Sequence, residues 1–97
     1  MNTTTPEIYR RADELPFRAL GPETVVVNTR SREVHVLNGT GAHIWNLLVE
    51  ARSLAELMEA LEAEFELDPA AARPEVASFV ADLLDKGLVT ATPRSGP

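Results

Sequence analysis

Residues 34–48 constrain the fold more than any other part of the chain, because a strand pattern changes there into a helical one. Residues 34–37 are typical of a β-strand, and residues 38–41 read Asn-Gly-Thr-Gly. Asn-Gly usually forms a β-hairpin turn. The next residues have instead the 3.6-residue period of a helix, with apolar side chains at Ile44, Trp45, Leu47 and Leu48. The chain is therefore predicted to leave a strand and enter a helix at this junction.

Three segments before the junction have the composition of β-strands. Residues 16–20 form a short candidate, and Gly21-Pro22 then turns the chain into residues 23–28, whose β-branched run is the clearest strand signal. A polar loop leads to a third strand over residues 33–37. Together they predict an antiparallel meander, with one face formed by Val25, Val27, Val34 and Val36. Such a meander needs helices to cover it.

Three helical segments come after the meander. Asn38 or Thr40 is expected to cap the first helix. Ser53-Leu54-Ala55-Glu56 has the pattern of a capping box and is expected to begin the second. Asp68-Pro69 reads as the N-cap and first residue of a third helix.

Two residues of the third helix mark its limits. Pro74 would clash with the carbonyl of Ala70 and lacks a donor, so we expect a kink or a restart there. Gly87 suits the position just after the helix end, and residues 88–89 are expected to run on as a short terminal strand. The predicted fold class is α+β, a small winged helix-turn-helix-like domain with a three-stranded antiparallel sheet followed by three helices.

Length and composition indicate one small globular domain. A chain of 97 residues with 44% hydrophobic and 25% charged residues is typical of a soluble protein. We expect an N-terminal arm over residues 1–14 that is partly disordered, a folded domain over residues 15–90, and a disordered tail over residues 91–97. The first residues lack the apolar segment of a secretory signal, and no apolar run reaches the roughly 20 residues of a membrane span. The expected location is the cytoplasm, away from membranes.

The net charge of −6 is concentrated in one part of the chain. Residues 1–37 carry five basic and five acidic side chains, whereas residues 38–97 carry four basic and ten acidic ones. An acidic surface repels phosphates. Nucleic acid is therefore not an expected partner, even though three helices on a small sheet also suit a DNA-binding winged helix.

No set of residues has the spacing of a catalytic or metal site. His35 and His43 lie eight residues apart in two different elements, which is no recognised ligand or dyad spacing. The Gly39-Thr40-Gly41 segment lacks the lysine and further glycine of a phosphate-binding loop. The outer ridge of an amphipathic helix, where side chains stay in solvent and do not suit acid catalysis, is formed by Glu56, Glu59, Glu62 and Glu66. The interpretation is a protein that is not an enzyme and holds no metal and no cofactor.

The chain resembles the PqqD family, the peptide chaperones known as RiPP recognition elements. The resemblance covers about residues 15–90. It rests on residues 36–42, on Ile44-Trp45 and Leu47-Leu48, and on the later positions Ser53-Leu54, Leu57, Leu61, Phe79, Leu83 and Gly87-Leu88-Val89.

This resemblance implies a domain that binds the leader segment of a ribosomally made precursor peptide and presents it to a modifying enzyme. The leader is expected to add as an antiparallel strand to residues 33–37 and to pack against the third helix. A strand edge offers main-chain hydrogen bonds, and alternate side chains give specificity. The candidate peptide-binding residues are Glu33, Val34, His35, Val36, Leu37, Val76, Phe79, Asp82, Leu83 and Lys86.

Several alternatives stay open. Phe79 and Leu83 are expected to form the groove floor, yet Phe79 also suits a plain core position. Asp82 and Lys86 either select charge on the leader or form an i,i+4 surface pair. The pathway is either quinone-cofactor synthesis with a radical SAM enzyme or lasso-peptide synthesis with a leader peptidase. The expected state is a monomer or weak homodimer, and the alternative function is a DNA-binding or self-associating module.

Overall fold

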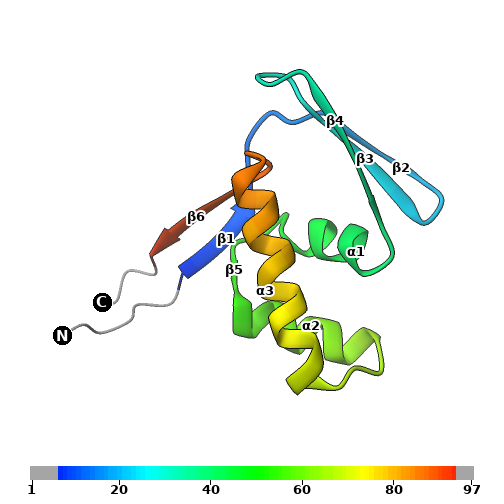
Figure 1. The fold of residues 1–97 in the computed structure, drawn as a ribbon, viewed down its shortest axis with the longest axis vertical. Helices are drawn as coiled ribbons and strands as arrows, with labels where there is room; N and C mark the ends of the chain where they lie inside the picture. The colour runs from blue at the N-terminus through cyan, green and yellow to red at the C-terminus, as the bar shows by residue number, and fades with distance from the viewer. Residues whose placement is uncertain (1–6, 94–97) are drawn as a thin grey trace.

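The computed structural model describes residues 7–93. Within this range the chain forms two three-stranded sheets and three helices (Figure 1). The predicted α+β fold, with a three-stranded antiparallel sheet and three helices, is confirmed. In the described range, no helix is long and apolar enough to cross a membrane.

The predicted meander is the sheet formed by β2 (Phe17–Leu20), β3 (Glu23–Asn28) and β4 (Glu33–Asn38). Its strand order is β2-β3-β4 and both pairings are antiparallel. Val25 pairs with Val36 and Val27 pairs with Val34, so these four valines do share one face.

The valine face is the open face of the sheet, which corrects the expectation that the helices cover it. Val34 and Val36 are 62% and 56% exposed. The buried side chains are those of the other face, with Val26 on β3 and Leu37 on β4. The alternation of side chains along a strand shows which residues share a face of the sheet. It does not show which of the two faces the helices pack against.

A second sheet lies beside the helices and has the order β5-β1-β6. It contains β1 (Glu7–Arg11), β5 (Arg52–Ser53) and β6 (Val89–Pro93), which extends beyond the predicted residues 88–89. Residues 7–11 were predicted as part of an N-terminal arm, but their strand partners come from much later in the chain, where no local pattern reveals them. The disorder predicted for the two ends falls partly on residues 1–6 and 94–97, which lie outside the described residues.

Helix α1 (Thr40–Leu47) begins directly after β4. Its N-cap is Gly39, which has a φ of 55° and makes no side-chain cap hydrogen bond. The prediction of an Asn38 or Thr40 cap was therefore wrong. A positive φ is easily adopted by glycine, so the tight strand-to-helix turn uses backbone freedom in place of a side-chain cap.

The other two helix starts agree with the sequence. Helix α2 (Leu54–Glu64) has the predicted capping box, in which the Glu56 amide donates to Ser53 Oγ at 3.1 Å and the Ser53 amide donates to Glu56 Oε1 at 2.8 Å. Helix α3 (Pro69–Asp85) is capped by Asp68, which accepts a hydrogen bond from the Ala70 amide at 3.2 Å.

Helix α3 continues through Pro74 as one helix, so the restart that was one of the two expected outcomes does not occur. Pro74 lies close to the helix start, so its missing N–H removes one hydrogen bond while the later turns remain intact. The C-terminal end of α3 is as predicted. Gly87 has a φ of 75°, and the Leu88 amide donates to the Leu83 carbonyl at 2.9 Å in a Schellman motif.

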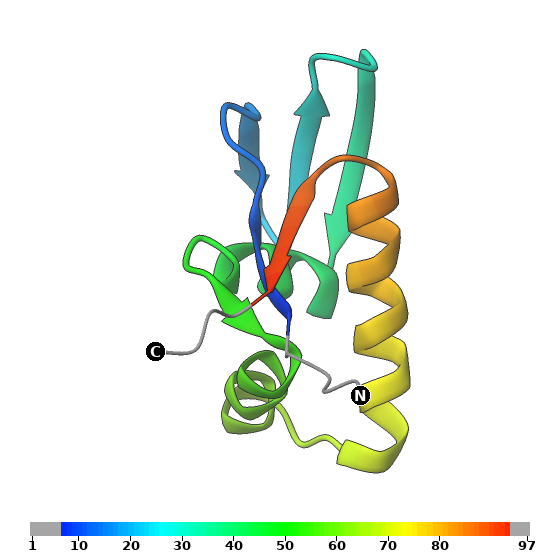
Figure 2. The same cartoon turned by 90° about the vertical axis from the view of Figure 1, so that its left-hand side faces the viewer.

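The hydrophobic core lies between the three helices, the second sheet and the inner face of the β2-β3-β4 sheet, and α2 packs on α1, α3, β1 and β5 (Figures 1 and 2). Trp45 and Ile44 of α1 are almost fully buried in it. Its other members come from both sheets and from α2 and α3, including Val26, Leu57, Leu61, Val80, Leu83 and Leu88. This single core fixes α3 relative to β4, and these two elements frame the candidate site.

Candidate functional site

Strand β4 is an edge of its sheet. Its inner side pairs with β3, and no described strand pairs with its outer side. It stands on the same side of the molecule as α3 (Figure 2). An edge of this kind carries unpaired backbone N–H and C=O groups, which form a template for another strand.

An apolar cavity of about 380 Å³ lies at the lower end of this edge. The end of β4, the first turn of α1 and helix α3 contribute its walls, among them Asn38, Gly41, Ile44, Val76 and Phe79. Its volume falls within the roughly 300 to 1,000 Å³ of small-ligand pockets. It therefore has room for apolar side chains of a bound peptide.

A second hollow of about 770 Å³ runs along the outer side of α3 and is more open. Its lining includes Glu75, Ser78, Asp82 and Asp85, which recur at the three- and four-residue spacing of one helix face. Phe79 and Glu75 line both hollows. Of this lining, Glu75, Ser78 and Asp85 were not predicted as site residues, although the helical spacing is visible in the sequence.

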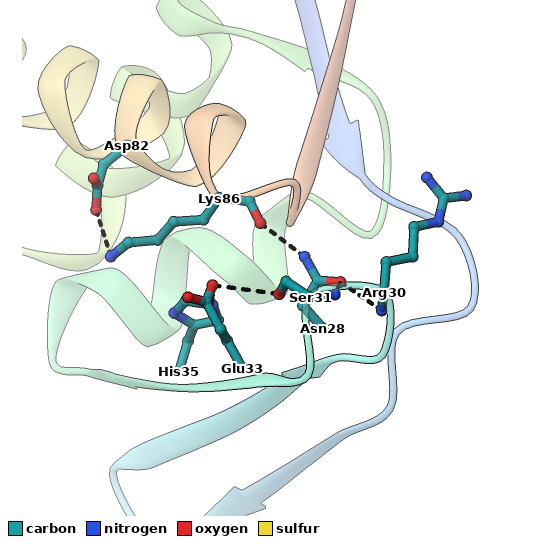
Figure 3. A network of polar contacts seen from close by, with 7 residues as sticks. All are labelled: Asn28, Arg30, Ser31, Glu33, His35, Asp82 and Lys86. Carbon is teal, nitrogen blue, oxygen red and sulfur yellow. Dashed lines mark hydrogen bonds and ion pairs between the residues drawn. The ribbon is translucent and has the colours of Figure 1, made fainter.

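A polar network joins the upper ends of β4 and α3 (Figure 3). Asn28 Nδ2 donates to the Lys86 carbonyl at 2.8 Å, and Asn28 Oδ1 accepts from the amide of Arg30 at 3.0 Å. Glu33 Oε1 accepts from Ser31 Oγ at 3.3 Å and lies 3.5 Å from His35 Nε2. Asn28 thus anchors the β3–β4 hairpin to the end of α3.

Asp82 and Lys86 form an ion pair at 2.8 Å on α3. Figure 3 shows this pair on the helix, across from Glu33 and His35 on β4. With Glu75 and Asp85 in the outer hollow, the described side chains that frame the site carry more acidic than basic charge. A surface of this sign does not attract the phosphates of nucleic acid.

The structure distributes these predicted site residues over four environments. Phe79 is half-buried and lines the cavity, Val76 is buried but reaches its wall, and Asp82 and Lys86 lie on the exposed side of α3. Val34 and Val36 point to the open face of the sheet. Leu37 and Leu83 lie in the core.

Leu83 is 1% exposed, so it supports the groove from beneath and is not part of its accessible surface. The cavity is lined instead by Phe79, one turn before Leu83 on α3, and by Ile44 of α1. The spacing of apolar residues in the sequence places Phe79 and Leu83 together on the apolar face of α3. Only the packed structure shows that Leu83 lies in the core and that Phe79 lies at the edge of this face.

Together, the fold and the groove define a small winged-helix-like domain with an open strand edge and an apolar cavity between that edge and the third helix. The chain matches the family described as coenzyme PQQ synthesis protein D (PqqD) over residues 23–89. The protein belongs to the PqqD family. The match spans β3, β4, β5, the three described helices and the first residue of β6.

Two solved structures share this fold. TbiB1, in complex with the TbiA(beta) leader peptide, has a TM-score of 0.75 and 24% sequence identity, covering 82% of this chain and 93% of that chain. Lasso peptide synthetase B1, complexed with the leader peptide, has a TM-score of 0.72 and 27% identity, covering 84% and 96%. No curated protein matches the sequence.

Proposed function

We propose that this protein binds the leader segment of a ribosomally synthesised precursor peptide and presents it to a modifying enzyme. The observation that carries the proposal is the outer edge of β4, which pairs with no strand in residues 7–93, beside the cavity formed with α1 and α3. Membership of the PqqD family and the likeness to two proteins solved with leader peptides support it. The proposed binding unit is residues 15–90.

The leader is proposed to extend as a fourth strand along β4. Each main-chain hydrogen bond contributes about 0.5 to 1.5 kcal/mol net, so a short strand alone gives modest affinity. Specificity then depends on alternate leader side chains. Those on the helix side reach Phe79 and the cavity, while those on the other side join the face of Val34 and Val36.

The charged residues are proposed to tune this recognition. Asp82 and Lys86 neutralise each other, whereas Glu75 and Asp85 on the same hollow have no described ion pair. A basic leader side chain that passes over α3 would gain from them at low salt. These acidic side chains favour a peptide partner with basic residues and disfavour a polyanion.

The wider setting is part of the same proposal. The chain acts in the cytoplasm as a non-catalytic partner of an enzyme such as a radical SAM protein or a leader peptidase. The protein is a monomer or a weak homodimer. In the alternative function, self-association, a second copy would occupy the same β4 edge; DNA binding is disfavoured by Glu75, Asp82 and Asp85 on α3.

An amide chemical-shift titration tests the proposal. Labelled protein is titrated with leader peptides of several modified-peptide classes, with a short DNA duplex as control. The proposal predicts saturable shifts in residues 33–38 and 75–86 with one peptide class and none with duplex. Shifts on duplex addition or on simple dilution, with no response to any peptide, would contradict it.

A proline placed at Val36 provides a second test. It disturbs the strand that the leader must pair with, so leader affinity should fall while helix α3 is unchanged. Circular dichroism and thermal unfolding establish that the variant is folded. Unchanged affinity in a folded Val36→Pro variant would exclude strand addition at β4.

A further inference from the structure

The valine face of the β2-β3-β4 sheet is an exposed apolar surface. The strand register places five apolar side chains on it: Leu20, Val25, Val27, Val34 and Val36. Leu20, Val34 and Val36 are each more than half exposed. A contiguous apolar surface of this kind on a soluble protein usually marks a site of interaction with another macromolecule.

The charged residues on the valine face are Arg18 and Glu23, one of each sign. Arg18 pairs with Val25 across β2 and β3, and Glu23 precedes Val25 by two residues, so all three side chains point to the same side of the sheet. Arg18 and Glu23 are both exposed, and neither forms an ion pair with another described residue. The valine face is therefore electrically balanced in a chain whose net charge is −6.

This balance of charge favours a second copy of the chain as the occupant of the valine face. Two copies that each carry a net charge of −6 repel one another, most strongly through the acidic outer side of α3. The valine face is free of that repulsion. It is also self-complementary, because in a two-fold pair a contact from Arg18 to Glu23 of the other copy is repeated in the opposite direction.

The positions of the two charges on the sheet are compatible with such a pair. Arg18 and Glu23 are diagonal neighbours, roughly 7 to 8 Å apart. A two-fold axis between the two sheets, placed midway between these positions, sets each Arg18 opposite Glu23 of the other copy. The same axis passes close to Val25 and Val36, so the valines of the two copies meet at the centre. The strands then cross steeply, as in the orthogonal class of sheet packing.

The size of the valine face indicates a weak association. Three strands of up to six residues cover roughly 15 Å by 20 Å. A stable interface buries roughly 800 Å² on each partner. The valine face alone is smaller than this, so two copies should associate reversibly and only at high protein concentration.

We propose that this protein forms a weak two-fold dimer through its valine face, with the valines at the centre and an Arg18–Glu23 pair on each side. Because the two sheets pack face to face, the outer edge of β4 stays open in each copy. The dimer therefore differs from self-association in which a second copy occupies the β4 edge. It forms whether or not a leader peptide is bound.

Sedimentation equilibrium of the full chain, without any peptide, tests the proposal. The average mass should rise from that of one chain toward that of two as the protein concentration is raised to about 1 mM. A mass that stays at that of one chain over this range would overturn the dimer. Since no peptide is present, either result is independent of leader binding.

Two valine variants locate the contact. Val34 and Val49 are similarly exposed, at 62% and 55%, but Val49 follows α1 and lies outside the sheet. Val34→Lys should weaken the dimer at least about tenfold, because the charge replaces apolar contact in both copies. Val49→Lys makes the same change of charge and should leave the dimer unchanged. Equal effects of the two substitutions would overturn the assignment to the valine face.

A charge exchange tests the pairing itself. Arg18→Glu and Glu23→Arg each bring like charges together, so each should weaken the dimer at least about fivefold, although they change the net charge in opposite directions. The double variant Arg18→Glu/Glu23→Arg restores opposite charges and should recover the affinity. Arg30→Glu, in the β3–β4 loop, matches the charge change of Arg18→Glu and should have little effect at about 0.15 M salt.

The same variants distinguish the valine face from the β4 edge. Arg18 lies on β2, the strand farthest from that edge, so an edge-to-edge dimer would not respond to the charge exchange. A double variant as weak as the single ones, or a dimer that none of these charge variants affects, would overturn the proposed pairing.

Discussion

Phe79, like Glu75, lines both hollows along α3, and it is the apolar residue of the two. The sequence places it on the apolar stripe of a helix but does not distinguish a core position from a groove position. The structure separates it from Leu83, which the core buries completely. The difference arises from packing against α1, which the sequence does not reveal.

Phe79→Ala is expected to weaken leader binding by about 1 to 2 kcal/mol, or roughly five- to thirtyfold, because an apolar anchor of the groove is lost. Fluorescence anisotropy with a labelled leader peptide measures this change. Phe65→Ala is the control, since Phe65 is also partly exposed and packs on His43 outside both hollows. Similar losses in the two variants would argue against a groove at Phe79.

Gly41 controls the position of the Phe79 ring. A Cβ atom at Gly41 would lie 2.9 Å from Phe79 Cζ, so Gly41→Ala must displace the ring. The ring is half-buried and can move, and alanine is favoured over glycine in a helix by up to about 1 kcal/mol. We expect the melting temperature to change little while leader affinity falls. A large loss of melting temperature with normal affinity would contradict this.

Among the elements, β4 shows most clearly where a sequence pattern is incomplete. The period of two correctly predicts that Val25, Val27, Val34 and Val36 share a face. Their composition suggests that this face is buried, yet the helices cover the face that holds Thr24, Val26 and Leu37. The residue type of Pro74 likewise suggested an interruption of α3, but one helix runs through it because Pro74 lies near the helix start.

The assignment of the two sheet faces can be tested with one substitution at two positions. Val26→Thr buries a hydroxyl in the core and should lower the free energy of unfolding by about 1 to 3 kcal/mol. Val36→Thr is exposed and should change it by less than about 0.5 kcal/mol. Chemical denaturation of both variants measures the difference. The opposite order would mean that the valine face is the buried one.

At the scale of the whole molecule, local patterns predict the β2-β3-β4 meander and the helices but not the second sheet. Strand β1 pairs with β5 and with β6, whose residues lie more than 40 and about 80 positions later in the chain. No local period indicates such pairings. The sequence could indicate the strand and the helix on either side of the candidate groove, because each has its own local pattern. It could not indicate the cavity, because β4, α1 and α3 together form its walls.

The distribution of charge belongs to this scale as well. With a net charge of −6 and acidic residues on the outer side of α3, the protein should not bind duplex DNA in the manner of a winged helix. Anisotropy of a labelled duplex should stay flat at low salt, where such binding is strongest. Duplex binding that weakens steeply with added salt would favour the DNA-binding alternative.

Hydrogen exchange of the β4 amides, measured by NMR with and without bound leader, tests strand addition most directly. A strand added to β4 pairs with every second residue of its outer edge. Exchange should therefore slow at alternate amides of residues 33–38, namely those that point away from β3, with the strongest effect beside the Phe79 cavity. Leader binding that leaves these amides exchanging as in the free protein, or that protects only α3, would contradict strand addition.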